Sequence, residues 1–92
     1  MIVRILGEGQ WDVDAAHIDA LNHLDQNLED AVEAGNHDVF RAKLHELLGA
    51  IRIAGRALPL DSLLDSDLML PPADATLEEV RDLLGDEGLI PG

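Results

Sequence analysis

The sequence predicts an α+β fold: a small β-sheet, made of an N-terminal hairpin and one short strand, packed on an antiparallel helical hairpin, with a short third helix. Three observations carry this prediction. Apolar and polar residues alternate at the N-terminus, as in half-buried strands. Between residues 18 and 51 apolar residues recur at steps of three and four, as in amphipathic helices. A helix-capping sequence at residue 76 opens a further amphipathic segment.

The N-terminal segment has the pattern of a β-hairpin. Val3 and Ile5 flank a polar residue, which predicts a strand over Ile2–Leu6. The glycines of Gly7-Glu8-Gly9 allow the positive φ angles that a tight turn needs. Alternation resumes in Gln10–Val13, which we expect to be the returning strand with Gln10 on the polar side.

Two helices follow, with recognisable ends. Asp14 is suited to cap the first helix and Asn36 the second, and Gly35 and Gly55 are suited to end them. The first apolar stripe is Ile18, Leu21, Leu24, Leu28 and Val32, extended by Ala20 and Ala31; the second is Phe40, Leu44, Leu47, Leu48 and Ile51. Because the connection is so short, the helices must run antiparallel with their stripes in contact.

The last third of the chain predicts a loop, a strand and a helix. Arg56–Asp67 is expected to be a loop, and Leu68–Leu70 a short buried strand that Pro71-Pro72 ends. Thr76 and Glu79 match a capping box. The third helix has an apolar face of Leu77, Val80, Leu83 and Leu84, and Gly85 ends it.

Ninety-two residues suit one domain with a modest core, so we expect a single domain over residues 1–92. The core must be mainly aliphatic, because Trp11 and Phe40 are the only aromatic residues. The predicted core is Val3, Ile5, Leu21, Leu28, Phe40, Leu44, Leu47, Leu48, Ile51 and Leu68.

The net charge of −13 restricts the classes of partner. Nucleic acids and anionic lipids would be repelled, so the charge favours a cationic partner, or serves solubility alone. The sequence has no cysteine, no apolar run near the ~20 residues of a membrane span, and no signal-peptide pattern. We therefore expect a cytoplasmic protein without direct membrane insertion.

The sequence predicts neither an enzyme nor a metal or cofactor site. The four histidines, His17, His23, His37 and His45, lack the close spacing of zinc ligands. Gly7-Glu8-Gly9 lacks the third glycine and the helix of a dinucleotide-binding fingerprint. Zinc should therefore give no saturable stabilisation.

The two long helices carry candidate partner-binding residues. Asp19, Gln26 and Asp30 lie opposite the first apolar stripe, with Glu33 on its border. Arg41, His45, Arg52 and Arg56 line one flank of the second helix. This basic flank can dock into an acidic groove or pair with the protein's own acids, and we favour pairing.

Small residues beside this flank predict close packing. Gly49 inside a helix costs ~1 kcal/mol relative to alanine, and together with Ala42 and Ile53 it lets another backbone approach. That backbone can belong to the protein's own hairpin or to a second subunit, and we favour the hairpin.

The two ends of the chain together resemble the PspA-associated protein family, PspAA. The resemblance rests on Met1–Gln10, on Ala34-Gly35 with Phe40-Arg41, and on Leu68–Gly92. It implies a partner of PspA, the membrane-remodelling coiled-coil protein of the phage-shock envelope-stress response, and no enzymatic role. It transfers no binding residues.

The function expected from this resemblance is a non-catalytic adaptor for a PspA-like coiled-coil protein, which recruits it to the inner face of the membrane. The alternative is a stand-alone homodimeric regulatory or ligand-sensing domain. In the first case the polar face of helix one steers the encounter, while exposed apolar groups supply the affinity.

Overall fold

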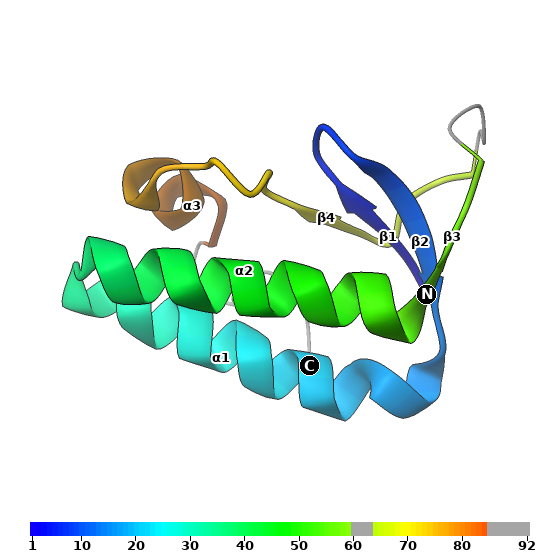
Figure 1. Ribbon diagram of the computed structural model, residues 1–92, viewed down its shortest axis with the longest axis horizontal. Coiled ribbons are helices and arrows are strands. Elements are labelled where there is room, and N and C mark those ends of the chain that lie inside the picture. The colour runs from blue at the N-terminus through cyan, green and yellow to red at the C-terminus, as the bar shows by residue number, and fades with distance from the viewer. Residues whose placement is uncertain (60–63, 85–92) are drawn as a thin grey trace.

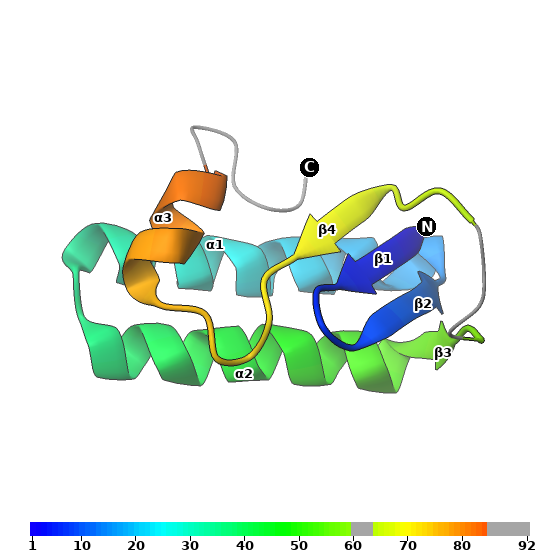
Figure 2. The ribbon, with the colours of Figure 1, turned by 90° about the horizontal axis from the view of Figure 1, so that it is seen from above.

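The computed structural model describes residues 1–59 and 64–84 and has the predicted α+β architecture. A four-stranded sheet and a short third helix lie on the same side of a layer of two long helices (Figures 1 and 2). The elements are β1 (Ile2–Ile5), β2 (Gly9–Val13), a 3-10 turn η1 (Ala15–His17), α1 (Ile18–Ala34), α2 (His37–Ala54), β3 (Gly55–Ala57), β4 (Leu68–Leu70) and α3 (Leu77–Leu84). The sheet covers one end of the helix layer and α3 covers the other (Figure 2).

The sheet is mixed, with the strand order β3-β2-β1-β4. β1 pairs antiparallel with β2, with Val3 opposite Trp11, and parallel with β4, with Val3 opposite Leu68. β3 pairs antiparallel with β2, so that Ala57 lies opposite Trp11. The prediction of a loop from Arg56 onward is therefore wrong for Arg56 and Ala57, because these residues find hydrogen-bonding partners on β2.

Gly35 and Asn36 act as predicted at the helix ends, whereas the prediction that Asp14 caps the first helix is wrong for α1, which begins at Ile18 with His17 as its N-cap. The Asp14 carboxylate accepts the Ala16 N–H at 3.0 Å, which caps the 3-10 turn that leads into α1. Gly35 ends α1 at φ 71°, a left-handed conformation that suits glycine. The Asn36 side chain accepts the Val39 N–H at 3.2 Å, so α2 begins after only two connecting residues.

The core lies between the sheet, α3 and the inner faces of α1 and α2. All ten residues predicted for the core are buried: Val3, Ile5, Leu21, Leu28, Phe40, Leu44, Leu47, Leu48, Ile51 and Leu68. Val13, Leu70, Leu77 and Val80 are buried with them. Ala20, expected to extend the first stripe, is exposed on the far side of the helix layer.

The strand β4 is buried on one face only, since Met69 is 55% exposed between two buried leucines. In α3 the Thr76 hydroxyl accepts the Glu79 N–H at 3.2 Å and donates to the Glu79 carboxylate at 3.1 Å, as a capping sequence would have it. The predicted helix end at Gly85 lies outside the described residues.

Gln10 is buried, although its place in the alternation put it on the polar side of the hairpin. Its Nε2 donates to the Leu64 carbonyl at 2.8 Å and contacts the Ser66 hydroxyl at 2.9 Å. Leu64 and Ser66, which precede β4, thus satisfy the amide of this buried residue. Local alternation could not predict this, because the two partners lie 54 and 56 positions away in the sequence.

Candidate protein-interaction surface

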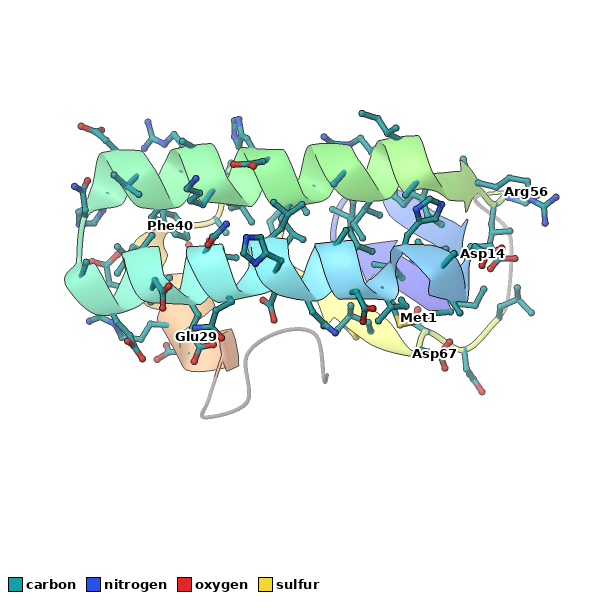
Figure 3. The ribbon with its side chains drawn as sticks, turned by 90° about the horizontal axis from the view of Figure 1, so that it is seen from below. Met1, Asp14, Glu29, Phe40, Arg56 and Asp67 are labelled. Atoms are coloured by element: carbon teal, nitrogen blue, oxygen red, sulfur yellow. The ribbon has the colours of Figure 1, made fainter. Side chains whose placement is uncertain are left out.

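The helix layer has an outer face, which we define as the side of α1 and α2 turned away from the sheet and α3. Figure 3 looks directly at this face, with the two helices in front and the sheet behind. Two large apolar side chains of α2 are exposed: Ile53 at 89% and Val39 at 42%. Val39 and Ile53 are 14 residues apart, which is about four helical turns, so they lie on the same side of the helix. Their exposure is not explained by any packing within the described residues.

The outer face also has free space above Gly49 of α2. A Cβ built on Gly49 would meet no atom within 4 Å. The N-terminal hairpin therefore does not pack on Gly49, Ala42 and Ile53, and the interpretation that favoured this hairpin is wrong. The hairpin instead extends on the opposite side of α2, where its turn residue Glu8 meets Arg52.

Two hollows mark the groove between α1 and α2 on this face. One has a volume of about 380 Å³ and is mainly apolar, lined by His17, Ala20, Leu21, Leu24, Ala50, Ile53 and Ala54. The other has a volume of about 320 Å³ and is lined by Asn27, Asp30, Ala31, Ala34, Asn36, Val39 and Lys43. Lys43 also forms an ion pair with Glu46, at 3.5 Å.

The predicted acidic residues form one rim of the outer face. Asp19, Gln26, Asp30 and Glu33 are all exposed on α1. Gln26 Nε2 donates to Asp30 Oδ1 at 3.0 Å, one helical turn away. We call these four residues the acidic rim.

Several acids of α1 act on the carboxyl group of Glu29. Partial burial, and then the negative charges of Glu33, Asp25 and Asp30, raise the pKa of Glu29 above its ordinary value of 4.5. Burial and these neighbouring charges thus disfavour the ionised form of Glu29.

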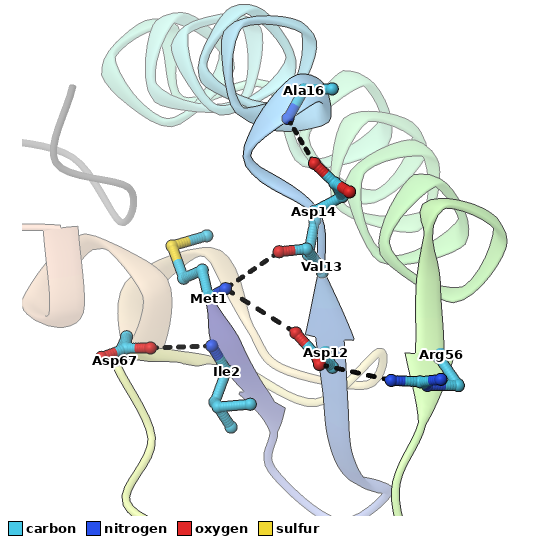
Figure 4. A network of polar contacts seen from close by, with 8 residues as sticks. All are labelled: Met1, Ile2, Asp12, Val13, Asp14, Ala16, Arg56 and Asp67. Atoms are coloured by element: carbon cyan, nitrogen blue, oxygen red, sulfur yellow. Dashed lines mark hydrogen bonds and ion pairs between the residues drawn. The ribbon is translucent and has the colours of Figure 1, made fainter.

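The basic flank lies apart from the acidic rim, on the side of α2 that meets the hairpin and the segment before α3. Arg52 forms a two-pronged ion pair with Glu8, with Nε 3.1 Å from Oε2. Arg56 lies 3.7 Å from Asp12, which also lies 3.8 Å from the Met1 amino group (Figure 4). Arg52 and Arg56 therefore contact acids of the same chain, the arrangement favoured from the sequence.

The other two residues of the flank face the start of α3. His45 Nε2 lies 3.3 Å from the Ala73 carbonyl. Arg41 lines a hollow of about 390 Å³ between α2 and α3, together with Phe40, Asp74 and Thr76. At its edge His37 lies 4.0 Å from Glu78. The charged side chains that line this hollow have both signs, Arg41 on one side and Asp74 and Glu78 on the other. The Thr76 hydroxyl in its lining is engaged in the cap of α3.

Within residues 1–59 and 64–84, no group of three or more His, Cys, Asp or Glu side chains is placed to hold a metal ion. Over the same residues, none of the helices combines the length and the apolar character that crossing a bilayer requires.

The sequence pattern indicated Asp19, Gln26, Asp30 and Glu33, and it placed Ile53 where another backbone can approach, but it did not predict the hollows between the two helices. Val39, Glu46 and Ile53 are seven residues apart, and Ala50 follows Lys43 by seven. This heptad spacing is the signal that could have found the groove, because it is typical of helices that pack side by side.

Comparisons with known proteins give one match. No curated protein and no solved structure is significantly similar to the chain. The family model PspAA, described as PspA-associated protein, matches residues 1–92. That description states an association with PspA and names no reaction. Because the match extends over the whole length, the chain belongs to the PspA-associated protein family.

Proposed function

We propose that this protein is a non-catalytic adaptor that binds a PspA-like coiled-coil protein in the bacterial envelope-stress response. It acts in the cytoplasm and reaches the inner face of the membrane through that partner. The observation that carries the proposal is the outer face of α1 and α2, which combines an acidic rim with exposed Ile53 and Val39. A surface of this kind is suited to pack against a helical protein.

The acids and the apolar groups have different tasks in this proposal. Asp19, Asp30 and Glu33 attract a basic partner over several ångströms and raise the rate of encounter. Ile53 and Val39 lose their contact with water in the complex, which lowers the dissociation rate. The basic flank takes a smaller part, because Arg52 and Arg56 already contact Glu8 and Asp12.

The steering role can be tested with charge reversal. The triple variant Asp19→Lys, Asp30→Lys, Glu33→Lys changes the net charge by three times two, from −13 to −7. Its association with a purified PspA-like protein should be about tenfold slower at low salt, and the difference should shrink as salt rises. Stopped-flow or surface-binding kinetics over a salt series measures both effects.

A matched control separates the location of the charges from their sum. The variant Asp74→Lys, Glu78→Lys, Asp82→Lys makes the same change of net charge with exposed acids around α3. It should slow association much less. Equal slowing by the two variants would show that net charge alone steers, and a rate at the wild-type level for the α1 variant would move the search to Arg41 and its neighbours on the basic flank.

A further inference from the structure

We propose that the groove between α1 and α2 on the outer face seats a single helix of the coiled-coil partner, so that three helices pack side by side in the complex. This inference rests on the proposed function and specifies its binding site. Two hollows lie between α1 and α2 on this face, one beside Ile53 and one beside Val39, near the two ends of α2. α2 has 18 residues and so offers about 27 Å of helix, enough for about five turns of a partner.

The spacing of the outward residues fits a helix as the occupant. On α2, Val39, Lys43, Glu46, Ala50 and Ile53 follow one another at steps of four, three, four and three. On the other side of the groove, His17 at the end of η1 and then Ala20, Leu24, Asn27, Ala31 and Ala34 of α1 follow one another at steps of three, four, three, four and three. Ala31 is buried where it lines the hollow beside Val39, and Ala20 and Ala34 are exposed. Such a seam keeps the same side of a helix turned toward a partner helix over its whole length.

The size of these residues allows the partner to come close. Ala20, Ala34 and Ala50 line the groove, and Gly49 borders it with open space above its Cα. Small residues permit helix axes near the short end of the ~8–10 Å range. Ile53 stands above this surface with 89% of its area exposed and provides the anchor that would enter a pocket on the partner.

A polar layer interrupts the apolar groove. Lys43 and Glu46 form an ion pair at 3.5 Å, and Asn27 lines the same hollow as Lys43. In coiled coils a polar position inside an apolar seam fixes the register of the helices at some cost in stability. The partner helix should therefore place a polar residue opposite Lys43 and Glu46, with small or aliphatic residues on either side.

Charge complementarity decides between a partner helix and a second copy of this chain. Asp30 of the acidic rim lines the hollow beside Val39, and the other residues of the rim are exposed on the same helix. A helix with basic residues on the side facing α1 would be attracted. A second copy would instead bring another −13 charges against this surface. The occupant is thus a basic-edged amphipathic helix of the partner.

Two variants test the seat itself. Ile53→Asp places a charge at the anchor, and Gly49→Leu fills the space that the partner helix needs, while neither residue packs in the core. Each should weaken the affinity for a purified PspA-like protein by about tenfold or more. Met69→Asp is the control, because Met69 is 55% exposed in the sheet rather than on the helix layer, and it should bind as the wild type does. Titration calorimetry gives the affinities, and circular dichroism verifies the fold.

The outcomes distinguish this inference from the proposed function. If the wild type binds and both variants bind equally well, the partner lies elsewhere and the groove is not its seat. If the wild type does not bind the PspA-like protein, the proposed function is wrong, and so is the inference that a helix of that protein occupies the groove. If sedimentation shows a wild-type dimer that Ile53→Asp separates, the occupant is a second copy, and the inference is overturned in favour of a homodimer.

Discussion

The amide of Gln10 and the carbonyl of Leu64 are joined by a hydrogen bond of 2.8 Å across 54 positions of sequence. Gln10 is 4% exposed, and the same amide contacts the Ser66 hydroxyl. The bond holds Leu64, four residues before β4, to the beginning of β2. It therefore couples the edge strand β4 to residues that lie two strands away.

Gln10→Ala should destabilise the protein by about 1–3 kcal/mol, because it removes the amide that bonds to the Leu64 carbonyl and the Ser66 hydroxyl. Urea unfolding measures the change. Gln26→Ala is the matched control, since Gln26 bonds only to an exposed carboxylate and should cost less than about 0.5 kcal/mol. Equal losses of unfolding free energy in the two variants would show that the buried hydrogen bonds of Gln10 stabilise the fold no more than the exposed bond of Gln26.

Leu44→Ala should cost about 2–5 kcal/mol, which is a large part of the stability of a domain of this size. Leu44 is fully buried on the inner side of α2, where the sheet and both long helices meet. Ile53→Ala, on the outer side of the same helix, should change the free energy of unfolding by less than about 0.5 kcal/mol. An unchanged urea midpoint for Leu44→Ala would contradict the position of the core.

Gly49→Ala should stabilise the protein by up to about 1 kcal/mol, because an added Cβ meets nothing within 4 Å and alanine favours the helix. Gly55→Ala should destabilise it, since the same Cβ would lie 2.9 Å from the Ile51 carbonyl oxygen and 2.9 Å from Trp11 Cβ. Thermal unfolding of the two variants should therefore shift in opposite directions. A lower melting temperature for Gly49→Ala would mean that the outer face is not open.

Glu29 should make stability depend on pH. Its pKa is raised in the folded state by partial burial and by the charges of Glu33, Asp25 and Asp30, so folding favours the protonated form. The ionised carboxylate is therefore unfavourable at neutral pH, and this penalty is relieved as the pH falls through the raised pKa toward 4.5 and below. Glu29→Gln should be more stable than the wild type at neutral pH, and the gain should vanish at low pH.

A second variant tests the cause of this shift. Glu33→Gln removes one of the charges that raise the pKa of Glu29, so that pKa should move down toward 4.5 when the carboxyl group is titrated by NMR. A pKa that does not move would assign the shift to partial burial and the other two acids.

Periodicity and capping residues predicted the helices well, because the inner stripes and the residues Asp14, Gly35 and Asn36 act locally. The strand β3 escaped prediction because Arg56 and Ala57 have no alternating pattern of their own. They become a strand only where β2 supplies hydrogen-bonding partners. The parallel pairing of β1 with β4 escaped for the same reason, since nothing in Leu68–Leu70 specifies its neighbour or its direction.

For the candidate site, the structure confirms the exposure of the acidic rim, while its role in binding a partner stays a prediction. The periodicity of α1 correctly predicted that the acidic rim is exposed to solvent, because residues opposite an apolar stripe face away from the core. The periodicity of α2 placed Ala42 and Gly49 on one side of the helix, but it could not predict whether another part of the chain packs on them. That depends on where the hairpin folds, and Glu8 meets Arg52 on a different side of the helix.

The inner and outer sides of α2 should differ in how many amino-acid replacements they tolerate. Leu44, Leu47 and Leu48 are closed in by the rest of the chain, so most replacements there would be removed by loss of folding. The side chains of Val39 and Ile53 are exposed, and a Cβ on Gly49 would meet no atom within 4 Å, so replacements of these side chains should leave the scaffold intact. This face is therefore free to change in step with a partner, and a single scaffold can acquire new specificity without losing the shape that presents it.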